Sequence, residues 1–212
     1  LGLGDAQWLL RDRQAALDSY RNGAQAAQQA DDPWVEGFCL RQTGVILLEQ
    51  DEVDQAAEAA ERAIEVFRGA DEKRGTGMAL LTLANCHSAR SDHGEAIERS
   101  REAVRLFTSI DDRWSVAWAN CHLGLALTES GAHAEALGVY EDALEVFREF
   151  GNKRNQARAL IGIAEAQHPL GHLPEARRSY TAAAEILQSL EDPQTADLLQ
   201  RLQHLNTALN EQ

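Results

Sequence analysis

Residues 124–147, GLALTESGAHAEALGVYEDALEVF, carry the pattern from which the fold follows. A small residue, Gly124, is followed twelve positions later by Ala136 and four positions after that by Tyr140. Apolar residues recur three, four and seven positions apart on both sides of a short turn at Gly131, which is the spacing of amphipathic helices. The stretch therefore predicts two helices joined as a hairpin.

The pattern returns every 40 residues along the chain. One place always holds alanine: Ala16, Ala56, Ala96, Ala136 and Ala176. The place seven residues later holds Gly23, Ala63, Ala103, Ala143 and Ala183. Four residues beyond it the side chains are mostly large: Ala27, Phe67, Phe107, Phe147 and Leu187. Twelve residues before the first alanines stand Gly4, Gly44, Ala84, Gly124 and Ala164. Small residues at fixed places let neighbouring helices approach closely, and large residues fill the spaces between them.

Two kinds of turn separate the helices. Acidic or small polar pairs stand between the repeats: Asp31-Asp32, Asp71-Glu72, Asp111-Asp112, Gly151-Asn152 and Glu191-Asp192. Within a repeat, Gly131 and Gly171 suit the left-handed residue that follows a helix. Asp32-Pro33 and Asp192-Pro193 predict a capping side chain followed by a proline in the first turn.

Helices are expected at residues 1–10, 13–30, 33–49, 53–69, 73–89, 93–109, 113–129, 133–149, 153–169, 173–189 and 194–209. They make about five repeats, at 1–32, 33–72, 73–112, 113–152 and 153–192. The last helix, within 193–210, departs from the register and is expected to cap the open end. No Pro/Gly/Ser-rich linker divides the chain, so one domain over 1–212 is expected. The predicted fold is all-α, a right-handed superhelical solenoid of antiparallel helix pairs.

The amino-acid composition limits the partners and the cellular compartment that can be expected. The formal net charge of −14 should repel phosphate backbones and anionic lipids, so we expect no direct nucleic-acid binding by this segment. Its apolar runs are too short to cross a bilayer, and no membrane association is expected. Three cysteines, Cys39, Cys86 and Cys121, in a chain large enough to fold without disulfides indicate a reducing compartment, hence the cytoplasm. The opening at Leu1 rather than Met suggests a fragment of a longer protein.

The succession Gly124, Ala136, Tyr140 and Ala143 is similar to the tetratricopeptide repeat, and the resemblance covers nearly the whole chain. The period is 40 residues here, whereas the usual repeat has about 34. Long repeats with an acidic turn and a following basic residue, as in residues 71–74, resemble the C-terminal repeats of large bacterial signalling ATPases of the STAND type. Among these are the actinobacterial antibiotic-regulatory (SARP) transcription activators. Eukaryotic polarity and motor adaptors carry similar long repeats.

The resemblance implies that the first helix of each hairpin lines a concave groove. The period gives three rows of inward places: Phe38, Met78, Trp118 and Arg158; Arg41, Leu81, Cys121 and Ile161; Val45, Asn85, Leu125 and Glu165. Exposed rows of large apolar side chains usually mark an interaction site. We therefore expect these rows to receive the apolar face of a partner helix, with Arg41, Asn85 and Arg158 as polar anchors. The alternative is that superhelical curvature buries part of the rows as core.

The expected partner is a protein or peptide, or another domain of the same protein. The first interpretation is the regulatory repeat region of a cytoplasmic bacterial transcriptional regulator. A free-standing adaptor is the second. The third is a homo-oligomerisation module, with a homodimer formed through the apolar rows and Leu1, Leu3 and Leu9. A small-molecule effector in the groove is a further alternative.

Catalysis, cofactors and metals are not expected. No motif sets a nucleophile against a base, and no phosphate-binding loop is present. Cys86-His87 and Cys121-His122 combine zinc ligands, but adjacent residues on a helix diverge by about 100°. Both Cys39 and Cys86 share their places with alanines and are read as small core residues.

One further row alternates aromatic and cationic residues just after the interrepeat turns: Trp34, Arg74, Trp114 and Arg154. Neighbours in this row could make cation–π contacts between adjacent repeats. The alternative is that they cover the edge of the core.

Overall fold

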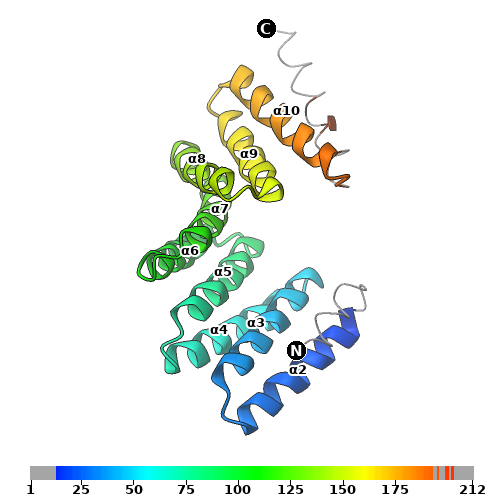
Figure 1. The fold of residues 1–212 in the computed structure, drawn as a ribbon, viewed down its shortest axis with the longest axis vertical. Coiled ribbons are helices and arrows are strands. Elements are labelled where there is room, and N and C mark those ends of the chain that lie inside the picture. Colours follow the sequence, from blue (N-terminus) through cyan, green and yellow to red (C-terminus); the bar gives the residue numbers. More distant parts are fainter. Residues whose placement is uncertain (1–12, 193–194, 196–198, 201, 203–212) are drawn as a thin grey trace. The chain divides into compact units, whose positions relative to one another are not determined.

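The computed structural model describes residues 13–192 together with residues 195, 199, 200 and 202. Over these residues the fold is all-α, as predicted, with α2 (Arg13–Gln29), α3 (Pro33–Glu49), α4 (Val53–Gly69), α5 (Lys73–Ala89), α6 (His93–Thr108), α7 (Arg113–Glu129), α8 (His133–Glu149), α9 (Lys153–Gln167) and α10 (Leu173–Ser189) (Figure 1). The helix expected at 1–10 lies outside the described residues. So does most of the capping helix expected at 194–209, although residues 195, 199, 200 and 202 are helical.

The helices pack as two compact units, residues 1–112 and residues 113–212. In the N-terminal unit, α2 packs on α3, and the hairpins α3–α4 and α5–α6 are joined by contacts between α4 and α5. In the C-terminal unit, the hairpins α7–α8 and α9–α10 are joined by contacts between α8 and α9. Each 40-residue repeat therefore supplies two helices, and the expectation of one continuous domain stays a prediction.

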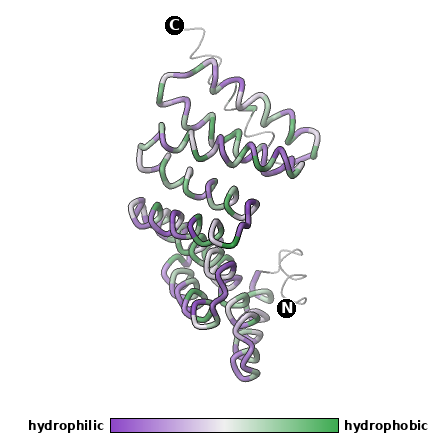
Figure 2. The backbone as a smooth tube through the Cα atoms, turned by 60° about the vertical axis from the view of Figure 1, so that its left-hand side comes forward, coloured by the Kyte–Doolittle hydropathy of each residue, from purple (hydrophilic) through white to green (hydrophobic). Residues whose placement is uncertain are grey.

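The residues that recur every 40 positions form the core of both units. All five alanines of the first register have no exposed surface: Ala16, Ala56, Ala96, Ala136 and Ala176. A Cβ atom on Gly77 would lie 2.6 Å from the ring of Phe107, and one on Gly124 would lie 2.7 Å from the ring of Tyr140. These two glycines are therefore required by close helix contact. Figure 2 shows hydrophilic and hydrophobic residues interspersed along each helix, as amphipathic helices require.

The turns between the described helices each contain one residue in the left-handed conformation, and these residues recur every 20 positions. Gly131 and Gly171 have φ of 85° and 78°, as predicted. Six residues of the series are not glycine and have φ between 52° and 64°: Asp31, Asp51, Asp71, Ser91, Asp111 and Glu191. The next amide donates back across the last helical turn, as from Glu72 to the carbonyl oxygen of Phe67 at 2.8 Å. This bond satisfies a carbonyl that the helix end leaves open.

The helix ends follow local chemistry. Asp32 caps α3 as predicted, because its carboxylate accepts a hydrogen bond of 3.1 Å from the Val35 amide. The expected end of α9 at residue 169 is wrong, since the helix stops at Gln167. Pro169 has no amide hydrogen with which to continue the helix, and its ring does not fit in a helix interior. The helix that Asp192 was expected to cap lies largely outside the described residues.

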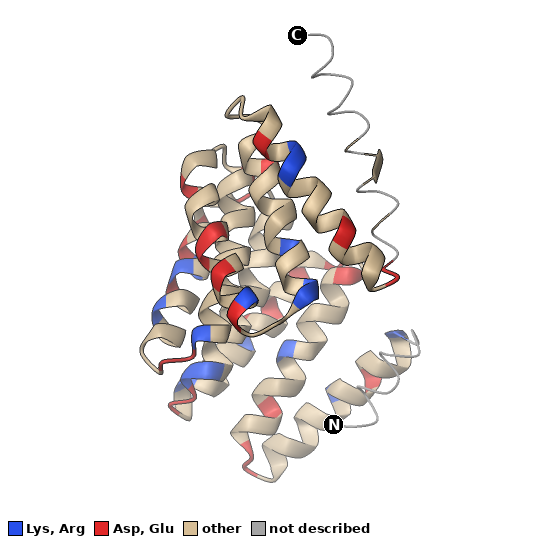
Figure 3. Ribbon diagram, turned by 45° about the horizontal axis from the view of Figure 1, so that its top comes forward, with Lys and Arg blue, Asp and Glu red and all other residues tan. Residues whose placement is uncertain are grey.

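Within each unit of the described chain, the row just after the interrepeat turns does not form the cation–π contacts that were one of its two interpretations, neither between Trp34 and Arg74 nor between Trp114 and Arg154. Arg74 instead pairs with Asp112 at 3.0 Å, and Arg154 pairs with Asp192 at 2.7 Å. Both pairs tie the start of a first helix to the acidic turn that ends the same repeat. Acidic residues occupy several of these turns, coloured red in Figure 3.

Candidate binding surface

Within each unit, the backbones of successive first helices approach closely, whereas those of successive second helices do not. The backbone of α3 lies against that of α5, and the backbone of α7 lies against that of α9. Among the described residues, no backbone contact joins α2 to α4, α4 to α6, or α8 to α10, although the side chain of Arg68 on α4 pairs with Glu102 on α6. A stack whose first helices are the closer ones curves toward them. Each unit thus has a first-helix face, on the side of the predicted groove rows, and an outer face between its second helices.

The first-helix face of the N-terminal unit carries an aromatic cluster on α3. The rings of Trp34 and Phe38 stack with centroids 5.6 Å apart and planes 13° from parallel. Arg41 places its guanidinium carbon 5.6 Å from the centre of the Phe38 ring, within cation–π range. The edge of Tyr20 from α2 lies 6.4 Å from the same ring. We call Trp34, Phe38 and Arg41 the N-terminal aromatic cluster.

The C-terminal unit carries a matching cluster on α7. Trp114 and Trp118 stack with centroids 5.8 Å apart and planes 8° from parallel. The guanidinium carbon of Arg158, from α9, lies 4.7 Å from the centre of the Trp118 ring. His122 meets the same ring edge-on at 5.3 Å. We call Trp114, Trp118 and Arg158 the C-terminal aromatic cluster, and its two tryptophans lie 80 positions after Trp34 and Phe38.

Most of the predicted groove residues remain partly accessible. The half-buried ones are Phe38, Arg41, Val45, Met78, Asn85, Trp118, Leu125, Ile161 and Glu165, and Arg158 is exposed. Leu81 and Cys121 are different, because they are only 2% and 1% exposed. Their assignment to an accessible surface is corrected here. These two residues belong to the core.

Sequence reasoning missed how the C-terminal aromatic cluster is assembled. It placed Trp118 and Arg158 in one row without predicting their contact, and it assigned no role at the surface to Trp114 or His122. A signal was present, because Trp114, Trp118 and His122 are spaced four apart and so share one side of α7.

Burial sets the protonation of the side chains beneath this cluster. Removal from water, together with the nearby Arg158 guanidinium, lowers the pKa of His122 to about 3. Burial raises the pKa of the Cys121 thiol to about 12 and that of the Cys86 thiol to about 11. Both thiols therefore stay protonated near neutral pH, whereas nucleophiles and zinc ligands need the thiolate.

Neither a metal cluster nor a membrane span is found in the part of the chain that the structure describes. There, no three His, Cys, Asp or Glu side chains come together in a way that could hold a metal ion. None of the described helices combines the length and the apolar character needed to cross a membrane.

The sequence profile of the tetratricopeptide repeat matches residues 38–109 and 115–189, which together exceed half of the chain. The chain belongs to the tetratricopeptide repeat family. Tetratricopeptide repeats are typically non-catalytic scaffolds that bind other proteins. A comparison with curated protein sequences found no match.

Solved tetratricopeptide-like structures resemble the fold. BtubC (BKLC) from P. vanneervenii has a TM-score of 0.76 at 18% identity, over 89% of this chain and 78% of that one. The apo form of RapI has a TM-score of 0.74 at 13% identity over 91% of this chain, which spans about half (54%) of RapI. A Rap protein complexed with competence and sporulation factor has a TM-score of 0.70 at 14% identity, over 98% of this chain and 74% of that one. At these identities the similarity shows the fold alone.

Proposed function

We propose that this chain is a polypeptide-binding module, the repeat region of a cytoplasmic bacterial regulator. It receives a partner segment on the first-helix face of its units. The partner is another protein or another domain of the same protein, and its binding controls the output of the regulator. The acidic turn and following basic residues at 71–74 support the regulator context. The buried cysteines Cys39, Cys86 and Cys121, which form no disulfide, support a reducing compartment.

The C-terminal aromatic cluster is the observation that carries this proposal. Trp118 is half-buried, and the exposed Arg158 lies over its ring. Tryptophan and arginine are the residue types most enriched where binding energy concentrates in protein interfaces. A guanidinium that lies over an aromatic ring still points its N–H groups outward in the guanidinium's own plane, where a carboxylate can accept from them. The complementary partner segment is therefore an amphipathic helix with an apolar stripe and an acidic residue opposite Arg158.

The comparisons support a bound partner in general terms. Tetratricopeptide repeats typically bind proteins or peptides. One similar structure, a Rap protein, holds the competence and sporulation factor. This fold can therefore carry a bound partner, and the first-helix face is where this chain presents its two aromatic clusters.

Selection from a random peptide library displayed on phage tests the proposal. The purified chain should enrich peptides with an apolar stripe and acidic residues. We expect Trp118→Ala to weaken their binding by at least about tenfold, because it removes an interface aromatic. Isothermal titration calorimetry with a synthetic peptide measures this change.

Two further variants keep this test interpretable. Arg158→Gln changes an exposed side chain, so it should keep the fold and still weaken binding of the acidic peptides. Phe150→Ala removes an aromatic ring that is 55% exposed at the end of α8, and it should leave affinity unchanged. Selected peptides that bind Trp118→Ala and Arg158→Gln as tightly as the wild type would overturn the proposal.

A further inference from the structure

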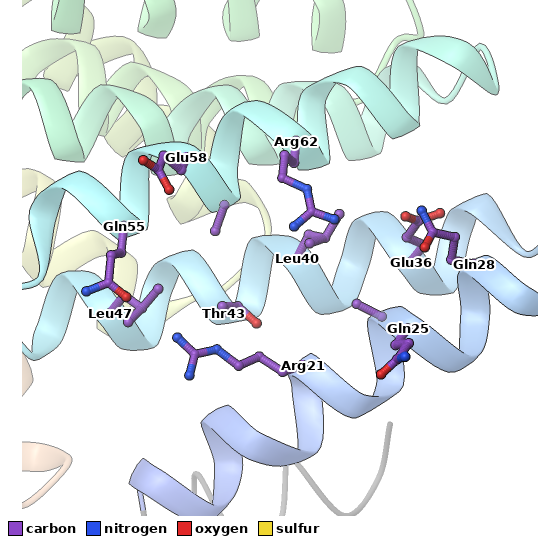
Figure 4. Close-up of a pocket in the computed structure, with 12 residues that line it drawn as sticks. Arg21, Gln25, Gln28, Glu36, Leu40, Thr43, Leu47, Gln55, Glu58 and Arg62 are labelled. Carbon is purple, nitrogen blue, oxygen red and sulfur yellow. The ribbon is translucent and has the colours of Figure 1, made fainter.

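A pocket of about 420 Å³ opens on the outer face of the N-terminal unit, between α2 and α4 and above α3 (Figure 4). Leu40 and Leu47 of α3 form its apolar floor. Its walls are polar and include Arg21 from α2 and Arg62 and Glu58 from α4. A volume of this size falls within the range of small-molecule sites.

The pocket is separate from the first-helix face. Its floor residue Thr43 and the groove residue Val45 are two positions apart on α3, which is a rotation of about 200° around a helix. They therefore point to opposite sides of α3. A ligand in the pocket and a polypeptide on the first-helix face can be bound at the same time.

Small side chains at three places create the pocket. Ala24, Thr43 and Ala59 line it, one from each of its three helices. One repeat later the equivalent residues are Ile64, Leu83 and Arg99, all of which are larger. Arg99 lies along α6, paired with Glu95 and Glu102. The gap between successive second helices is thus filled in the next repeat and left open in this one.

Thr43 supplies an independent sign that the space holds a ligand. Thr43 is only 6% exposed, and its Oγ1 atom is buried with no hydrogen-bond partner among the described residues. Figure 4 shows the hydroxyl turned from α3 into the pocket. A buried hydroxyl without a partner costs stability, and a ligand that hydrogen-bonds to it removes that cost.

The walls offer both signs of charge. Arg21 and Arg62 form no ion pair with any residue in the described part of the chain, and neither do Glu36 and Glu58. By contrast, the nearby Arg68 forms an ion pair with Glu102. Arg21 and Arg62 face the pocket without such a pairing to any described residue. They offer a binding place for an anionic group of a ligand.

We propose that this pocket binds a small zwitterion of dipeptide size. Arg21 and Arg62 hold its carboxylate, and Glu58 or Glu36 pairs with its ammonium group. The Thr43 hydroxyl hydrogen-bonds to a polar atom of the ligand, and an aliphatic side chain of the ligand covers the Leu40 and Leu47 floor. Such a ligand ties α2 to α4, which share no backbone contact among the described residues, so its occupancy braces the N-terminal unit.

Titration of the whole chain with glycyl-L-leucine tests this inference, followed by two-dimensional amide NMR. We expect saturable shifts centred on Thr43 and its neighbours in the pocket. N-acetyl-glycyl-L-leucine lacks the ammonium group and glycyl-L-leucinamide lacks the carboxylate, so each should bind at least about tenfold more weakly. No saturable shift with glycyl-L-leucine, or binding of either analogue as tight as that of glycyl-L-leucine, would overturn the proposal.

Variants of the pocket locate the site. Ala59→Arg introduces the residue that fills the equivalent place one repeat later, so it should abolish the shifts while the chain keeps its helical circular dichroism spectrum. Thr43→Val keeps the shape of the side chain, removes the hydroxyl, and should weaken binding several-fold.

Arg105→Gln is a control, because it changes an arginine of α6 that does not line the pocket, and it should have no effect on glycyl-L-leucine binding. Trp118→Ala should also leave glycyl-L-leucine binding unchanged, which separates this site from the proposed polypeptide site. Unaltered binding in Ala59→Arg would contradict the assignment.

Discussion

At the scale of single residues, His122 shows how an interior place shapes chemistry. Its imidazole lies beneath the C-terminal aromatic cluster and is 7% exposed. The equivalent place 80 positions earlier, in the N-terminal unit, is held by Gln42, whose side-chain amide donates to the Tyr20 hydroxyl at 3.5 Å. A neutral amide and a histidine whose pKa is lowered to about 3 are alike in one respect, because both remain uncharged at neutral pH.

His122 should make stability depend on pH. Its pKa is about 3 in the folded chain, against about 6.5 for an exposed histidine. Between these values the unfolded chain takes up a proton that the folded chain does not, so stability falls as pH drops below about 6.5. Lowering the pH from about 7 to about 5 should cost the wild type about 2 kcal/mol more than His122→Gln. Urea unfolding at both pH values measures this difference, and equal losses in the two proteins would contradict it.

At the scale of helices, the fold depends on large side chains that enter places held by small ones. Phe107 of α6 has no exposed surface, and its ring meets Gly77 of α5 where no Cβ atom would fit. The ring of Tyr140 lies against Gly124 in the same way. These contacts join a second helix to the first helix of its own repeat.

Phe107→Ala should therefore cost about 3–5 kcal/mol of unfolding free energy, because it removes a large core side chain and leaves a cavity beside Gly77. The loss should spread to adjacent repeats, since stability in repeat proteins is shared through neighbouring interfaces. Phe150→Ala is the matched control, as its ring is 55% exposed and its loss should cost far less. Thermal unfolding measures both, and midpoints near the wild type in both variants would contradict the packing register.

Helix positions were predictable from the sequence because the repeat marks both ends of each helix. A left-handed residue falls every 20 positions, and the small and large core places fall every 40. The end of α9 was misjudged because Pro169 overrode the period. The groove rows were less predictable, since a helical register shows which side of the helix a residue faces but not how far its side chain is buried. Leu81 and Cys121 lie in a predicted row and are nevertheless buried.

The sequence contains one of the two causes of the pocket. This cause is visible in the register, where Ala24, Thr43 and Ala59 are all smaller than the residues one repeat later. What the register could not give is the separation of α2 from α4, which decides whether small side chains leave a pocket or a closer contact. The stacking of Arg158 on Trp118 was likewise beyond the sequence, because it depends on how α9 packs on α7.

At the scale of the whole molecule, each unit carries its own aromatic cluster on its first-helix face. In the N-terminal unit the proposed partner lies along the first helices α3 and α5, and Met78 of α5 is positioned to report this. It is half-buried on the first-helix face and is the one methionine of the 212-residue sequence.

The most direct test of this claim is the NMR signal of the Met78 methyl group, observed in chain labelled with ¹³C-methyl methionine. A display-selected peptide should shift this signal to a new position as it saturates the chain. The same peptide concentration should leave the signal near its starting position in Phe38→Ala, because Phe38 belongs to the aromatic cluster of the same unit as Met78. A Met78 signal that stays in place while the wild-type chain is saturated with peptide would contradict the account.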